Sequence, residues 1–206
     1  FLTGYLDSVE HVPALRAIER SRWRLLPWWV ANEVVDRHPE RVGLEPRVVV
    51  VGAAGSMYDL RGWVAEHPLV AGYLRVSSYE KSATRLGSAA YFDLLAEQSA
   101  VVVAFSESRA MRIPVAKYVE VPAVGALLIA ARAHHLEEMG FQDGRNCIIF
   151  EGREDFEPKL RPFLERPSDF IRVAAAGRAL VASRHTTSHR MAELFDLLGV
   201  ILSPSD

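Results

Sequence analysis

The sequence predicts an α/β domain: a doubly wound, Rossmann-like parallel sheet with helices on both faces and a C-terminal helical segment. From residue 47 to residue 150, short apolar runs rich in β-branched residues alternate with segments of helical periodicity. This alternation is typical of buried parallel strands joined by helical crossovers. Beyond residue 150 only helical patterns follow. Ligands of such folds bind at the carboxyl ends of the strands, so we expect the functional site there.

The pattern places each element in turn. Strands are expected at 47–51, 69–76, 100–105, 125–130 and 146–150. Helices are expected between them at 58–67, 89–97, 114–121 and 134–139, and after them at 154–165, 167–183 and 188–198. Pro114 suits the first turn of a helix, and Gly140 suits the residue that follows a helix end.

Residues 1–45 differ from the rest and are expected to form a helical or interdomain segment that leads into the domain, residues 46–206. Residues 9–23 are helix-like, and 24–30 predict an edge strand or strand-like lead-in. Trp23, Trp28 and Trp29 crowd together here, and core packing is the expected reason. A surface for a partner domain is the alternative, because aromatic residues are enriched at interfaces. Since the chain opens with Phe1, we interpret it as a fragment of a longer protein.

Composition narrows the function classes. The 206 residues include 24 basic and 26 acidic ones, for a net charge of −2, which gives no electrostatic argument for nucleic acid or an anionic membrane. The sequence lacks an apolar run of about 18 residues, so we expect no membrane span. The single cysteine, Cys147, excludes an internal disulfide and favours a reducing, cytoplasmic compartment. Its apolar neighbours predict a buried strand residue.

A glycine-containing turn separates the first strand from the first helix. Gly52 and Gly55 allow a sharp turn and a close approach of the backbone to a ligand, and Ser56 offers a hydroxyl donor or a helix cap. The free N–H groups at the start of a helix favour phosphate. The spacing matches neither GxGxxG nor a Walker loop. An ordinary strand–helix turn therefore explains the segment as well as a phosphate loop does.

Three charged residues complete the candidate site. Arg61, in the helix after the turn, can direct its guanidinium at phosphate, or it can pair on the surface with Asp59 or Glu66. Lys117 and Glu120 lie three residues apart and share a helix face. A solvated salt bridge is the default for that spacing. Because their neighbours are apolar, we instead consider Glu120 an acceptor for ribose hydroxyls and Lys117 a counter-charge for a diphosphate.

The segment Lys117-x-x-Glu120-x-x-Ala123-x-Gly125, followed by an apolar strand, resembles the signature of retaining, metal-independent GT-B glycosyltransferases of the group-1 and spore-maturation-protein-like kind. Other segments agree with that family in order. Residues 26–33 resemble the crossover into the C-terminal domain, and residues 48–61 resemble the first strand and the turn that ends in Tyr-x-x-Arg. Residues 91–95 resemble the helix before the strand that leads to the signature, and residues 185–190 resemble the start of the terminal helix.

The resemblance implies that the chain is the nucleotide-sugar-binding C-terminal half of a GT-B fold. It implies catalytic roles for Lys117, beside the donor phosphate or sugar, and for Arg61, facing the diphosphate, and it implies ribose binding by Glu120. The donor-binding set that it implies is Gly52, Gly55, Ser56, Tyr58, Glu120 and Gly125. The donor is a nucleotide sugar of unspecified base, with no further cofactor and no metal. The acceptor-binding N-terminal domain, or a partner chain that replaces it, is not in this sequence.

Departures from the pattern keep two alternatives open. Arg112 stands eight residues before Glu120, where many relatives carry a second glutamate near the donor sugar. This favours a non-catalytic interaction or scaffold module. The other alternative is an unrelated doubly wound regulatory or oxidoreductase module, against which the lack of GxGxxG argues. His185 and His189 have helical spacing for a metal, but the sequence suggests no third ligand. Capping by Thr187 or Ser188, with packing of His189, is expected there instead.

Overall fold

The computed structural model describes residues 2–3, 15, 17–53, 55–76, 87–108 and 111–199. Its centre is a five-stranded parallel sheet of order β4-β3-β5-β6-β7. The strands are β3 (Val48–Val51), β4 (Gly72–Leu74), β5 (Ala100–Val103), β6 (Leu127–Ala131) and β7 (Ile148–Phe150). The five strands expected between residues 47 and 150 are thus confirmed. The chain adds β4 on one side of β3 and then β5 on the other, so the strand order reverses between β3 and β5.

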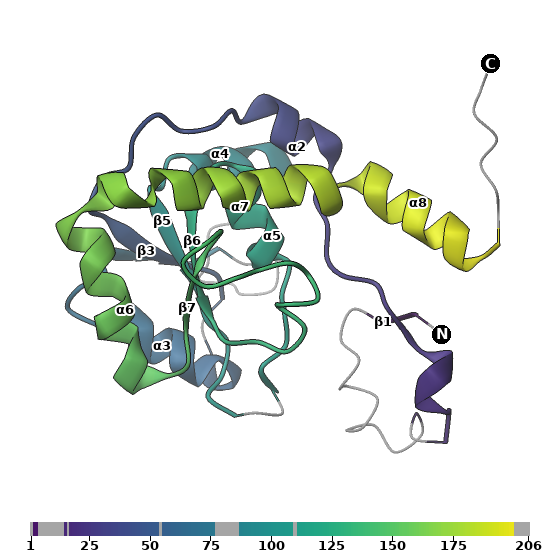
Figure 1. Ribbon diagram of the computed structural model, residues 1–206. Helices are drawn as coiled ribbons and strands as arrows, with labels where there is room; N and C mark the ends of the chain where they lie inside the picture. The colour runs from purple at the N-terminus through teal and green to yellow at the C-terminus, as the bar shows by residue number, and fades with distance from the viewer. Residues whose placement is uncertain are drawn as a thin grey trace.

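Helices cover both faces of the sheet (Figure 1). The helices are α2 (Asn32–Arg37), α3 (Asp59–Ala65), α4 (Ser88–Ala96), α5 (Lys117–Ala123), α6 (Arg153–Glu165), α7 (Ile171–Arg184) and α8 (Thr187–Leu197). Alternate strand residues face two separate cores. Val49 and Val101 pack with α2, α4, α5 and α7, whereas Val50 and Val102 pack with α3 and α6. The doubly wound architecture follows from burial of both faces.

One expected helix, at 134–139, is wrong. Residues 134–140 form a run of turns, because His135 adopts a positive φ of 61° that interrupts a right-handed helix. Leu136 and Met139 still reach the core from this irregular segment. Their apolar spacing therefore reflected burial and not a helix. The other helices expected after residue 57 are confirmed within a few residues, with α5 starting three residues after Pro114, at Lys117.

The N-terminal segment has less regular structure than expected. The expected strand at 24–30 is limited to β2 (Arg24–Leu25), which pairs in parallel with β1 (Leu2–Thr3). Of the expected helix at 9–23, residues 9–14 and 16 lie outside the described part of the chain, and 20–22 form a 3-10 helix. Trp23 is buried, but Trp28 and Trp29 are 46% and 41% exposed. Core packing is therefore wrong for the latter two.

The helices α2 and α8 differ in how closely they pack against the rest of the domain. The helix α2, which the sequence pattern did not predict, belongs to the main core through Val35, and Arg178 of α7 donates hydrogen bonds to the carbonyl oxygens of Val35 and His38. Helix α8 projects from the body of the domain (Figure 1) and exposes Met191 and Leu197. Among the described helices, none has the length and apolar character needed to cross a membrane.

Candidate functional site

The candidate site lies where β3 and β5 end side by side, at the reversal of strand order. Gly52 follows β3 with a φ of 141°, a conformation that side chains disfavour. Its amide donates to the carbonyl oxygen of Leu74 at the end of β4, at 3.1 Å. The turn is thereby fixed against the carboxyl edge of the sheet, and Gly52 itself is buried.

Arg61 of α3 crosses behind this turn. Its Nη1 donates to the carbonyl oxygen of Ala53 at 2.8 Å, and its Nε donates to that of Ala104, just after β5, at 2.9 Å. The residue is only 4% exposed, so the alternative of a surface pair with Asp59 or Glu66 is wrong. Burial lowers the pKa of Arg61, yet the guanidinium remains charged because its reference pKa is so high. The charged Arg61 guanidinium therefore links the segments that follow β3 and β5.

Lys117, the first residue of α5, approaches the same glycine. A Cβ atom placed on Gly52 would lie 2.8 Å from Nη1 of Arg61 and 3.4 Å from Cε of Lys117. The two cationic side chains thus meet at one backbone position that bears no side chain. Burial lowers the pKa of Lys117 and the charge of Arg61 lowers it further, while the nearby Glu120 carboxylate raises it. Chemically, the arrangement offers two concentrated positive charges to an anion.

Glu120 lies one turn further along α5. Its Oε2 accepts a hydrogen bond from the hydroxyl of Tyr91, on α4, at 2.7 Å. Burial raises the pKa of that hydroxyl, and the Glu120 charge raises it further, so Tyr91 stays protonated. Lys117 and Glu120 form no ion pair with each other, which makes the default of a solvated salt bridge wrong. Tyr91 is a site residue that the sequence pattern missed.

The remaining predicted residues divide into two groups. Tyr58 lies beside Arg61: the guanidinium carbon of Arg61 is 4.2 Å from the centroid of the Tyr58 ring. The Tyr58 ring also packs edge-on against Phe105. Ser56 and Gly55 are exposed at the start of the 3-10 turn Ser56–Tyr58 beside them. Gly125 lies instead at the opposite end of α5 from Lys117. It has a φ of 79°, and its missing Cβ would meet the carbonyl oxygen of Pro39 at 3.2 Å.

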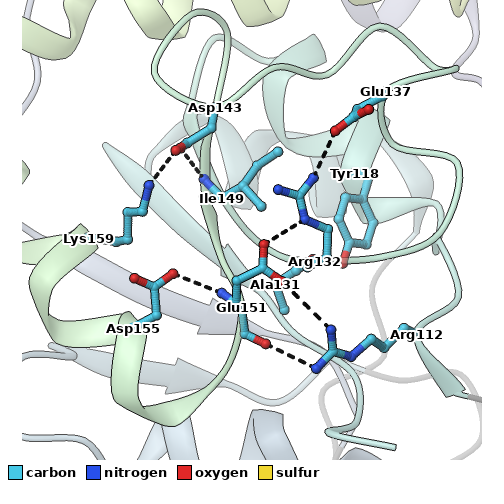
Figure 2. Close-up of polar contacts among 10 residues, drawn as sticks. All are labelled: Arg112, Tyr118, Ala131, Arg132, Glu137, Asp143, Ile149, Glu151, Asp155 and Lys159. Atoms are coloured by element: carbon cyan, nitrogen blue, oxygen red, sulfur yellow. Dashed lines mark hydrogen bonds and ion pairs between the residues drawn. The ribbon is translucent and has the colours of Figure 1, made fainter. Parts of the chain in front are cut away.

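Arg112 belongs to a neighbouring polar cluster at the ends of β6 and β7 (Figure 2). Its guanidinium donates to the carbonyl oxygen of Glu151 at 3.2 Å and lies 3.8 Å from the Glu151 carboxylate. Arg132 binds the same carboxylate at 2.9 Å. In Figure 2 both arginines converge on Glu151 from different loops. The side chain at the position of the expected second carboxylate is therefore a cation held by an ion pair.

The two C-terminal histidines point to different partners. His185 is buried, stacks on Phe141, and its Nε2 lies 2.7 Å from the carbonyl oxygen of Met139. His189 contacts the hydroxyl of Thr186. Within the described residues, no group of three or more His, Cys, Asp or Glu side chains could hold a metal ion.

The start of α8 is capped from a distance. The Asn32 amide contacts both the backbone N–H and the hydroxyl of Ser188, at 3.1 and 2.6 Å. The residue at the N-cap position, Thr186, makes no side-chain capping hydrogen bond. Capping by Thr187 or Ser188 is therefore wrong.

Sheet order, helices on both faces and the terminal helices together define the class: a Rossmann-like domain of the kind that forms the C-terminal half of the GT-B fold. A protein-family profile described as "Glycosyl transferase-like" matches residues 20–196. The chain belongs to this glycosyl transferase-like family, as its sequence motifs had suggested. In sequence alone, no curated protein matches it.

Solved structures share the fold. HepE from Anabaena, crystallised with UDP and glucose, has a TM-score of 0.67 at 13% identity, over 97% of this chain and 63% of that one. A glycosyltransferase from Rickettsia africae has a TM-score of 0.69 at 12% identity, over 99% and 64%. Sucrose-phosphate synthase from Thermosynechococcus elongatus has 0.60 at 13%, over 93% and 57%. The chain thus spans less than two thirds of the length of each of these neighbours.

Proposed function

We propose that this chain is the donor-binding half of a retaining, metal-independent glycosyltransferase, which transfers a sugar from a nucleotide sugar to an acceptor. The observation that carries the proposal is the convergence of Lys117 and Arg61 on the bare backbone of Gly52, with Glu120 one helical turn away. That HepE was crystallised with UDP and glucose supports a nucleotide-sugar ligand for this fold. Retention rests on the family resemblance.

In this proposal the donor diphosphate lies against Gly52. Lys117 and Arg61 stabilise the charge that develops on the leaving diphosphate, in the place of a divalent metal, because preorganised cations in a water-poor site stabilise such charge strongly. Binding of an anion also favours the charged form of Lys117, whose pKa is lowered by burial. Glu120 accepts a hydrogen bond from the ribose, and Ser56 and Tyr58 border the diphosphate.

The acceptor site requires a second domain, supplied by the same polypeptide or by a partner chain. Three observations support this part of the proposal. The chain spans 63% of HepE. The helix α8 exposes the apolar residues Met191 and Leu197. The strands β1 and β2 form an isolated two-stranded sheet of a size that is not stable alone. We further propose a cytoplasmic location, since the buried Cys147 thiol suits a reducing compartment.

Calorimetric titration with UDP, GDP, dTDP and their sugars tests the donor site. We expect one nucleotide to bind, and Glu120→Gln to weaken it by roughly ten- to a hundredfold, the effect of losing about 1.5–3 kcal/mol from a charged hydrogen bond. Glu97→Gln is the matched control, because Glu97 is exposed at the far end of α4. Equal affinities in the two variants would contradict the assignment of Glu120.

One observation favours a second candidate function, a glycosyltransferase-like scaffold without a ligand. Arg112 occupies the place of the expected second carboxylate and is engaged by Glu151. The same titration separates the two functions. A folded chain that binds none of the nucleotides, also when its second domain is supplied, would be a scaffold.

A further inference from the structure

We propose that Tyr91 is a positioning residue of the donor site, which fixes the Glu120 carboxylate through one oxygen and leaves the other for a ribose hydroxyl. The inference rests on the proposed function, because it concerns how Glu120 meets a nucleotide. The observation that carries it is the 2.7 Å hydrogen bond from the Tyr91 hydroxyl to Oε2 of Glu120, which connects α4 with α5. Within the described residues, Oε1 of Glu120 accepts no hydrogen bond.

The hydroxyl of Tyr91 is suited to this task because it is both fixed and protonated. Its ring packs against the main core and lies at an edge to Phe92, with centroids 5.4 Å apart. Burial and the adjacent carboxylate both raise the pKa of the hydroxyl, so it donates throughout the neutral range. A hydrogen bond to a charged acceptor is stronger than one between neutral groups.

Without Tyr91, Glu120 would have a competing partner. Lys117 shares its helix face three residues earlier, and the charge of Glu120 already raises the pKa of Lys117. An unrestrained carboxylate would gain Coulomb energy by turning toward that ammonium group. The ion pair would occupy both the ribose acceptor and one of the two cations at Gly52. Tyr91 therefore keeps the carboxylate and the cation separately available, and it removes rotamer freedom from Glu120 before the ligand arrives.

The test compares Tyr91→Phe with Tyr118→Phe. Tyr118 is the matched control because its buried hydroxyl also donates a 2.7 Å hydrogen bond, but to the carbonyl oxygen of Ala131. Each variant and the wild type are titrated with UDP and GDP, with their 2′,3′-dideoxy analogues, and with pyrophosphate. We expect Tyr91→Phe to weaken the ribonucleotide about three- to tenfold and to leave the dideoxy analogue and pyrophosphate unchanged. Tyr118→Phe should change none of them.

The outcomes separate the two proposals. If the wild type binds a ribonucleotide and Tyr91→Phe binds it equally well, or loses all three ligand types alike, the positioning role is refuted and the donor site stands. If a folded wild type binds none of UDP, GDP and dTDP, also when its second domain is supplied, the donor site itself fails and the role of Tyr91 fails with it. In the Glu120→Gln background, Tyr91→Phe should cause no additional loss, because the charged acceptor that it positions is gone.

Discussion

Substitution of Gly52 by alanine probes the centre of the site, and Gly55 provides a closely matched comparison. The two glycines have nearly the same φ, 141° and 143°, so alanine suffers similar backbone strain at both. Their surroundings differ. A Cβ on Gly55 meets nothing closer than a ring carbon of Tyr58 at 3.8 Å, whereas a Cβ on Gly52 would lie 2.8 Å from Nη1 of Arg61. The difference between the variants therefore isolates the contact with Arg61.

The expected losses of stability follow from two contributions, the backbone strain and the displacement of Arg61. Backbone strain of about 1–3 kcal/mol applies to both variants. At Gly52 the new methyl group must also displace the Arg61 guanidinium, which is held by the carbonyl oxygens of Ala53 and Ala104. Loss of one hydrogen bond of a buried charged group adds about 1.5–3 kcal/mol. Gly52→Ala should therefore lower the free energy of unfolding by roughly 2.5–6 kcal/mol, at least twice the effect of Gly55→Ala.

Urea unfolding followed by tryptophan fluorescence gives both free energies. A pyrophosphate titration of Gly52→Ala, at a temperature where it is folded, adds a functional measure, because a displaced Arg61 should weaken the anion. If Gly52→Ala costs no more stability than Gly55→Ala, the close approach of Arg61 does not constrain this position. The case for a cation held against bare backbone would then be lost.

Two further predictions concern the supporting structure. Gly177→Ala in α7 should lower the free energy of unfolding by about 1–3 kcal/mol, because its Cβ would lie 2.6 Å from the carbonyl oxygen of Asn146. Gly62→Ala in α3, where a Cβ would meet open space, should instead raise the free energy of unfolding by about 0.5–1 kcal/mol. Similar effects of the two variants in urea unfolding would contradict the close packing at Gly177. Burial, more than the nearby Arg190 charge, lowers the pKa of His185 to about 4 from 6.5. The unfolded chain therefore takes up the proton first, and stability should fall by roughly 3 kcal/mol as the pH drops from above 6.5 to below 4. His185→Gln should lose most of that dependence, and exposed His189→Gln should retain it; equal pH profiles would refute the assignment.

The sheet was predictable because its strands carry the signal themselves. A strand buried on both faces needs a continuous apolar run, and 48–51 and 100–103 consist of Val and Ala alone. The turns at 134–140 were not predictable in the same way, because apolar spacing reports burial and not backbone conformation. The positive φ of His135 arises in a segment fixed by tertiary contacts, such as the hydrogen bond between the His134 amide and the Arg112 carbonyl oxygen.

The candidate site was predictable to the extent that it depends on strand ends. The rule that ligands bind at the carboxyl edge selected Gly52 and Arg61, and the spacing of Lys117 to Glu120 among apolar neighbours selected Lys117; the structure brings the three together. Tyr91 was missed because its contact with Glu120 depends on how α4 packs on α5, which no local pattern encodes. Gly125 shows the opposite error, a residue that was assigned to the site although its place in the fold explains it. A glycine in a functional signature was assigned to the ligand, yet its positive φ and its contact with Pro39 give it a structural reason to be glycine.

The charges gathered at Gly52 couple the stability of the fold to an anionic ligand. Lys117 and Arg61 lie against one glycine, and burial together with the neighbouring cation lowers the pKa of Lys117. Keeping this ammonium group charged therefore costs free energy, and Glu120, the carboxylate that raises its pKa, is held by Tyr91 and forms no ion pair with it. An anion at Gly52 would remove that cost, so ligand binding and folding stability should be coupled. Saturation to a hundred times the dissociation constant would stabilise the fold by about 2.7 kcal/mol, part of which comes from relieving a repulsion that the sequence already builds in.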